Sequence, residues 1–150
     1  MKRHPSLARL SREHHGALIL ARLLQKNAPA YKGLPKDIEG KAVYALQFYE
    51  TELVKHFEIE ESVLQLVMGI NPTLDLLVQH IFREHQDLHG SFRSLKNHTG
   101  LEMTGHLDRL GKALEIHVRQ EERELFPLIE TTCNDKLMEV IDKKLSALSN

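Results

Sequence analysis

The sequence predicts an all-α fold, an up-down-up-down four-helix bundle over about residues 6–130 with a short extra C-terminal helix. Apolar residues recur at intervals of three and four almost throughout the 150 residues, without the sustained alternation that marks β-strands. Turn-forming residues divide this pattern into four segments of about 20 to 30 residues and a shorter last one, as in an antiparallel bundle. We expect residues 1–150 to form one domain, because a core of this size rarely splits.

The first helix is expected to begin at Ser6, an N-cap candidate behind a proline, and to run to about Asn27. Segment 28–35 contains two prolines and a glycine, which should end this helix. The second helix is expected to start at residue 35 or 36 and to continue to residue 68, with Gly69 as its C-cap.

The third helix is expected to begin at Asn71 and Pro72, because an N-cap residue followed by proline at the first helical position is a strong start signal. It should continue to about Lys96, where the segment 97–100 has the composition of a turn.

The fourth helix should cover about 102–126, and Pro127 is expected to kink or end it, because a proline removes a backbone hydrogen bond. A short fifth helix is expected over about 135–148, with either Thr132 or Asn134 as its cap.

The charge balance and the single cysteine exclude several classes of protein. Twenty basic and 21 acidic side chains give a formal net charge of −1, which offers no basic field for nucleic acid or for an anionic membrane surface. No apolar run is long enough to span a membrane. Cys133, the one cysteine, excludes an internal disulfide framework and a cysteine-based zinc site, so we expect a cytoplasmic protein. The sequence leaves a monomer and a homodimer as alternatives.

Histidine is the unusual residue, with ten in the chain, and it recurs in the pattern His-x-x-x-Glu. Two residues four apart on a helix emerge from the same face, so one cation could touch both side chains. The pattern also arises by chance, and we expect His80/Glu84 and His98/Glu102 to face solvent. The pairs that continue the apolar stripes of their helices, and therefore point inward, are His56/Glu60 and His117/Glu121.

Two further histidines take inward positions on the first and third helices. His14 stands between Leu10 and Ala17, and His85 takes the equivalent place on the third helix. Each half of the chain therefore supplies Glu-His on one helix and His-x-x-x-Glu on the next, which suggests a pseudo-two-fold duplication.

Six such groups in one interior predict a metal centre. Buried imidazoles and carboxylates without a partner cost several kcal/mol each, and a cation removes that penalty. The alternative is a metal-free polar core in which these groups bond one another. Nitrogen and oxygen donors without thiolate suit iron, manganese or zinc, and a pair of iron ions bridged by Glu60 and Glu121, each also bound by two histidines, fits best.

The segments 56–61 and 117–122, the latter continuing through Leu125, Phe126 and Pro127, resemble the hemerythrin-like HHE cation-binding domain family. The resemblance covers about residues 6–130. It implies a non-haem di-iron centre, oxo- or hydroxo-bridged, with manganese or zinc as other possible metals, and it implies as metal ligands His14, His56, Glu60, His85, His117 and Glu121.

One departure from the family pattern bears on function. Oxygen-carrying hemerythrins resemble this chain but take a fifth histidine from the third helix, one turn before the position of His85, where this chain has Ile81. Unless His89 substitutes as a further ligand, the set of four histidines and two glutamates is more similar to bacterial di-iron proteins of iron–sulfur repair and nitrosative stress.

Several neighbouring residues have two interpretations. His15 is the rival of His14, and Tyr49 is expected in the core, where its phenol could also end near the metal pocket. Glu61 and Glu122, beside the inward glutamates, are expected to be solvated charges. Glu13 and Glu84 should lie off the core face, although either could hydrogen-bond to a ligand.

The sequence favours a metal-binding protein whose partner is a small diatomic ligand, O2 or NO, in sensing, storage or the response to oxidative or nitrosative stress. A di-iron enzyme that acts on peroxide, O2 or NO is a second hypothesis. A third is an iron-responsive interaction module that folds when metal binds. No conventional acid–base pair, nucleophile or dinucleotide fingerprint specifies an organic substrate.

Overall fold

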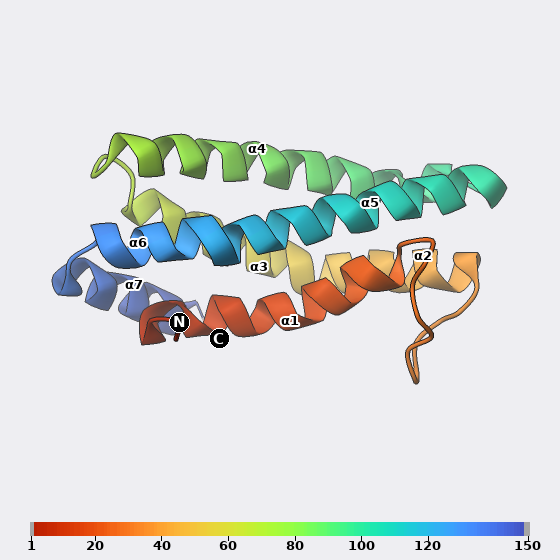
Figure 1. Ribbon diagram of the computed structural model, residues 1–150, viewed down its shortest axis with the longest axis horizontal. Helices are drawn as coiled ribbons and strands as arrows, with labels where there is room; N and C mark the ends of the chain where they lie inside the picture. Colours follow the sequence, from red (N-terminus) through yellow and green to blue (C-terminus); the bar gives the residue numbers. More distant parts are fainter. Residues whose placement is uncertain (1, 149–150) are drawn as a thin grey trace.

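The computed structural model describes residues 2–148, and this part of the chain is helical almost throughout and contains no strand (Figure 1). The prediction of an all-helical fold is therefore confirmed. No helix among residues 2–148 combines the length and the apolar character that crossing a bilayer requires.

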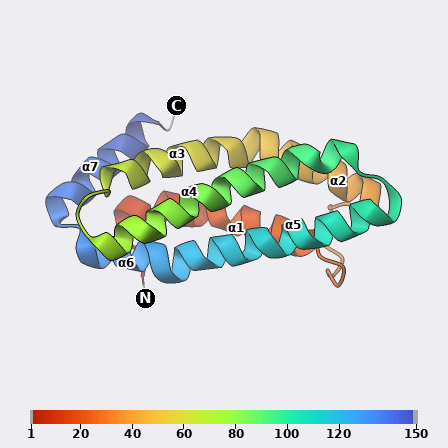
Figure 2. The same ribbon diagram turned by 90° about the horizontal axis from the view of Figure 1, so that it is seen from above.

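After a short 3₁₀ turn at Pro5–Leu7, the helices are α1 Ala8–Leu23, α2 Ile38–Phe48, α3 Val54–Leu66, α4 Pro72–Arg93, α5 Gly100–Gln120, α6 Phe126–Thr132 and α7 Asp135–Ala147. Two π-helical turns, Tyr49–Leu53 and Glu121–Leu125, join α2 to α3 and α5 to α6 without a break. The long helical segments lie side by side, and successive segments run in opposite directions (Figure 1, Figure 2). The last helix, α7, folds back beside α3 (Figure 2).

Several of the predicted helix ends are confirmed, but the second helical segment begins at Ile38, with Asp37 as its N-cap, rather than at residue 35 or 36. The side chains of Asn71 and Asn134 accept hydrogen bonds from backbone N–H groups in the first turns of α4 and α7. Gly69 has the left-handed φ of +87° that suits the turn after α3. Ser6 as an N-cap was a wrong prediction, because α1 begins at Ala8 and the Ser6 hydroxyl instead donates to the carbonyl of Met138, 3.0 Å away.

The end of α1 also differs from the prediction. The helix ends at Leu23 rather than near Asn27. Asp108 on α5 binds the chain just beyond this end, because its carboxylate accepts a hydrogen bond of 2.9 Å from the backbone N–H of Lys26. A tertiary contact therefore binds the chain just beyond the helix, and the local sequence of α1 does not contain that information.

Pro127 does not end the fourth helical segment, which continues to Thr132, so the predicted end at this position was wrong. The π-helical turn Glu121–Leu125 precedes the proline and changes the hydrogen-bond register there. The carbonyl of Glu122, five residues before the proline, accepts a hydrogen bond of 2.8 Å from Nη2 of Arg3. The N-terminal arm thus supplies a donor at a place where proline offers none.

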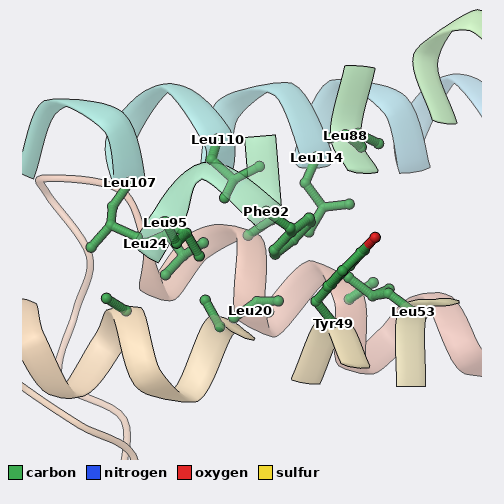
Figure 3. Close-up of a cluster of buried hydrophobic side chains, with 14 of the residues drawn as sticks. Leu20, Leu24, Tyr49, Leu53, Leu88, Phe92, Leu95, Leu107, Leu110 and Leu114 are labelled. Carbon is green, nitrogen blue, oxygen red and sulfur yellow. The ribbon is translucent and has the colours of Figure 1, made fainter. Parts of the chain in front are cut away.

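Two apolar clusters fill the interior, one toward the end of the molecule with α2 (Figure 3) and one toward the end with α6 and α7. On α1, Ala17 belongs to the first cluster and Leu10 to the second, and the buried His14 lies between them. On α4, His85 likewise lies between residues of the two clusters. A layer of buried polar side chains therefore separates two apolar cores.

Helices α1 and α5 approach each other closely beside the first apolar cluster. A Cβ atom at Gly111 on α5 would lie only 2.5 Å from the carbonyl oxygen of Ala21 on α1. Glycine at this position therefore allows the two helix backbones to pack together.

Candidate metal centre

The six inward-facing histidines and glutamates of the sequence prediction come together in the polar layer. Each of them is no more than 5% exposed. They form two overlapping groups, within each of which the donor atoms all lie within 4.8 Å of one another. Both groups contain Glu60 and Glu121. The first group, here called the α1/α3 half, adds His14 and His56, and the second, the α4/α5 half, adds His85 and His117.

Glu60 on α3 reaches both halves. Its Oε2 atom lies 3.3 Å from Nε2 of His56 and 3.6 Å from Nε2 of His14. Its other oxygen, Oε1, lies 3.1 Å from Nε2 of His85. The two oxygens of one carboxylate therefore face different halves, as in a bridging ligand.

Glu121 occupies the first position of the π-helical turn and also joins the halves. Its Oε1 atom lies 3.1 Å from Nε2 of His14 and 3.2 Å from Nε2 of His117. Its Oε2 atom lies 3.9 Å from Nε2 of His85. Isolated π-helical turns occur often at functional sites, and this one carries a buried carboxylate into the centre.

Most of the donor atoms at the centre lack hydrogen-bond partners, and this indicates that the site fits a cation. Lone pairs buried without a partner are costly, and a cation would engage all of them at once. The chemistry of this set, imidazole nitrogen and carboxylate oxygen, suits iron, manganese or zinc. The buried unpartnered atoms of the six residues are both carboxylate oxygens of Glu60 and of Glu121, together with Nε2 of His14, His85 and His117.

The carboxylates around the histidines control their protonation. Burial alone would lower the pKa of His85, but the carboxylates of Glu60 and Glu61 outweigh burial and raise that pKa to about 9. The same balance, with Glu121 as the main carboxylate, raises the pKa of His117 to about 10. Without a cation the histidines therefore hold protons that a cation would displace.

Burial opposes ionisation of Glu60, yet its contacts with Glu121 and with the histidines hold its pKa well below the ordinary range. This carboxyl group is therefore ionised within the protein interior. A buried carboxylate of this kind requires positive charge close by, from protonated histidines or from a cation.

Glu61 and Glu122 are not the solvated charges that the sequence analysis expected. Oε2 of Glu61 lies 2.7 Å from Nδ1 of His85, and Oε2 of Glu122 lies 2.6 Å from Nδ1 of His14. The signal that could have revealed them is the doubled glutamate in His-x-x-x-Glu-Glu, which places a second carboxylate directly beside each inward one.

Glu13 and Glu84 had two interpretations, and the structure favours hydrogen bonding to the central histidines. Oε1 of Glu13 lies 2.9 Å from Nδ1 of His56, and Oε1 of Glu84 lies 2.8 Å from Nδ1 of His117. A carboxylate on the outer nitrogen orients the ring and directs Nε2 to the centre.

The structure also places the rival residues. His15 is exposed, whereas its neighbour His14 is buried at the centre. His89 belongs to neither group of donors, and its Nδ1 atom lies 2.5 Å from the hydroxyl of Tyr49. Tyr49 itself is buried, and its ring stacks on Phe92 with a centroid distance of 4.8 Å.

One histidine of each half is covered by an aromatic ring. Phe126 stacks on His14 with a centroid distance of 5.5 Å and an interplanar angle of 5°. Phe57 stacks on His85 with a centroid distance of 4.3 Å. The other histidine of each half faces a cavity, of about 230 Å³ beside His56 and of about 110 Å³ beside His117.

Comparison with protein families decides the classification, because the model of the hemerythrin HHE cation-binding domain matches residues 5–129. The chain belongs to this family. Membership in the hemerythrin HHE family implies cation binding, and the buried cluster of histidine and glutamate is where this chain could hold metal. Comparison with curated proteins and with solved structures found no significant match.

Proposed function

We propose that this hemerythrin HHE domain holds two iron ions at the buried centre and binds a small diatomic ligand, O2 or NO, in sensing, storage or stress response. The observation that supports the proposal is the set of buried carboxylate oxygens and Nε2 atoms that face one another without hydrogen-bond partners. The proposal includes an up-down-up-down four-helix bundle as the scaffold that carries these groups.

In this proposal the six side chains have distinct tasks. Glu60 and Glu121 would be shared by the two ions, and each ion would also be held by two histidines, His14 with His56 or His85 with His117. Bound iron supplies coordination positions, beyond those that the six groups fill, at which a diatomic molecule can bind. Ile81 lies where oxygen-carrying relatives are expected to have a fifth histidine, which favours an open position in the α4/α5 half.

The surroundings of the centre support a small ligand over a large one. The cavities beside His56 and His117 have volumes of about 230 and 110 Å³. The rings of Phe57 and Phe126 cover the remaining two histidines. Neither cavity is lined by Glu60 or Glu121, so the centre itself is closed, which suits a diatomic molecule better than a large substrate. The apolar rings limit the water that reaches it.

The proposal is tested by loading the protein with iron, reducing it without oxygen, and recording the visible spectrum before and after O2 or NO is added. We expect a band that appears with one of these ligands and disappears when the ligand is removed. The metal-free protein and a His117→Ala variant serve as controls and should show no such band. A wild-type spectrum that neither ligand changes would refute diatomic ligand binding.

A further inference from the structure

The four central histidines share a second arrangement, on the side of each ring that faces away from the centre. Each Nδ1 atom meets a glutamate carboxylate, and that glutamate always comes from a different helical segment than the histidine. The pairs and distances are His14 with Glu122 at 2.6 Å, His56 with Glu13 at 2.9 Å, His85 with Glu61 at 2.7 Å, and His117 with Glu84 at 2.8 Å.

The four pairs form a closed cycle around the centre. The helix α1 supplies the carboxylate that contacts the histidine of α3, α3 supplies the one for α4, and α4 supplies the one for α5. The π-helical turn that continues α5 supplies the carboxylate for α1, which completes the circuit. Each long helical segment therefore gives one histidine to the centre and one carboxylate to a neighbouring segment.

In each helical segment, a residue that faces the centre is directly adjacent in the sequence to the glutamate that contacts a histidine of another segment. Neighbours on a helix point about 100° apart, so one can face the centre while the other reaches the next segment. On α1 and α4 the carboxylate directly precedes a histidine, and on α3 and in the π-helical turn it directly follows a central glutamate. The dipeptides are Glu13-His14, Glu84-His85, Glu60-Glu61 and Glu121-Glu122.

The contacts determine which ring nitrogen faces the centre with a lone pair. An ionised carboxylate only accepts hydrogen bonds, so the Nδ1 atom beside it must carry the proton. In the neutral ring Nε2 is then unprotonated, and its lone pair points inward. When a cation displaces the second proton of each ring, Nε2 is therefore the atom that would bind it, and Nε2 of His14, His85 and His117 are buried at the centre without a hydrogen-bond partner.

Solvent exposure separates these four carboxylates from the two central ones. Their side chains are between 23% and 36% exposed, whereas Glu60 and Glu121 are fully buried. They lie at the rim of the centre and act on a cation through the histidines rather than by contact.

We propose that Glu13, Glu61, Glu84 and Glu122 form a carboxylate ring that fixes the tautomer and orientation of the four histidines and thereby sets the affinity of the centre for cations. These glutamates are positioning residues. The inference rests on cation binding as proposed above and does not depend on which diatomic ligand binds.

The direct test measures Zn(II) affinity by competition with a chelator. We expect Glu61→Leu to lower the affinity of the α4/α5 half about 10- to 100-fold, because loss of such a partner has effects of that size. Glu61→Gln keeps an oxygen that can accept the Nδ1 proton, so its affinity should fall only about 3- to 10-fold. Glu58→Leu is the matched control, since Glu58 is an exposed residue of α3 outside the four pairs, and it should bind as the wild type does.

A second measurement detects positioning itself. In the Zn(II)-loaded wild type, nitrogen NMR should show all four histidines protonated at Nδ1, and Glu61→Leu should change this signature for His85 while leaving that of His14. A purely structural role would instead lower the melting temperature of the metal-free protein and leave the His85 signature unchanged.

The possible results distinguish failure of the carboxylate ring from failure of the proposed metal centre. Unchanged Zn(II) affinity and an unchanged His85 signature in Glu61→Leu would overturn the ring alone. If that variant does not fold, wild-type affinity in Glu61→Gln and in Glu84→Gln would overturn it equally. A wild type that binds no cation would overturn the proposed metal centre and the ring with it.

Discussion

The two halves of the centre have the same kinds of inner donor but differ in the residues that hold their outer carboxylates. In the α1/α3 half, Glu122 contacts His14 and is itself held by the hydroxyl of Ser11, at 2.8 Å, and by Nη2 of Arg3, at 3.4 Å. In the α4/α5 half, Glu84 contacts His117 and pairs with the partly exposed His80, at 3.2 Å. An arginine thus supports the carboxylate of one half, and a partly exposed histidine supports that of the other.

This difference shows how one repeated donor pattern can produce two unequal sites. The inner donors follow from the helical phase, which points one histidine and one His-x-x-x-Glu pair inward in each half of the chain. The outer support depends on the N-terminal arm, which lies against the α1/α3 half through Arg3 and has no counterpart in the repeat. We therefore expect the α1/α3 half to keep its ion longer.

The largest predicted effect tests whether the halves share their bridging carboxylates. Glu60→Ala removes oxygens that face both halves, so both affinities should fall by more than the roughly 100-fold that loss of an outer partner can cause. His56→Ala should empty the α1/α3 half alone. Elemental analysis after dialysis should find less than one ion per chain in the first variant and one in the second. Equal losses in the two variants would mean that Glu60 does not bridge.

The pH dependence of the metal-free protein tests the charge in the α4/α5 half. The folded pKa values of His85 and His117, about 9 and about 10, exceed the unfolded value of about 6.5. Their contribution to stability is therefore complete below about pH 6.5 and is lost as the pH rises through 9 and 10. Thermal unfolding in a chelator should show a melting temperature that falls between pH 8 and pH 11.

His117→Gln is the control for this titration, because other groups also titrate at high pH. Its melting temperature should fall less than that of the wild type over the same interval. An identical pH profile for the two proteins would contradict the raised pKa of His117.

A smaller effect is expected when the support of the α1/α3 half is removed. Chelator should extract ions from the wild type in two phases, the faster from the α4/α5 half. Arg3→Met keeps an apolar chain but loses the charge that holds Glu122, so the slow phase should accelerate by up to about 10-fold. Arg119→Met, which within residues 2–148 breaks a pair with Glu115 on α5, should leave both phases unchanged. An unaltered slow phase in Arg3→Met would show that Arg3 does not cause the slower release of the ion from the α1/α3 half.

The smallest effects concern the aromatic rings that cover His14 and His85. Phe126→Leu and Phe57→Leu keep an apolar side chain but lose the stacked face, and each should cost about 1 to 2 kcal/mol of unfolding free energy. Chemical denaturation measures that cost. In the chelator experiment, Phe126→Leu should speed the slow phase and Phe57→Leu the fast phase. Acceleration of the same phase in both variants would show that the rings do not act on separate halves.

The fold was predictable wherever local chemistry determines it. The three-and-four spacing predicted the helices, and the side chains of Asn71 and Asn134 cap their helices as expected. The π-helical turns were not predictable, because one extra residue in a turn barely alters the apolar spacing. The continuation of the helix through Pro127 was missed for a related reason, since the donor to the Glu122 carbonyl comes from distant Arg3.

The site was predictable to the extent that helical phase determines direction. Phase distinguished the inward His14 from the exposed His15, and it pointed the paired histidines and glutamates of both halves inward. It failed for Glu61 and Glu122 because phase gives the direction in which a side chain leaves its helix and not what the side chain reaches. A glutamate turned about 100° from the centre is still long enough to contact a histidine on the next helix.

The most direct test of the central claim is the number of metal ions in protein purified without added metal, measured by elemental analysis alongside protein concentration. The account predicts two iron ions per chain, one for each half, with both lost in Glu60→Ala. A chain that contains one ion or none, and that takes up no second ion when Fe(II) is supplied without oxygen, would contradict it.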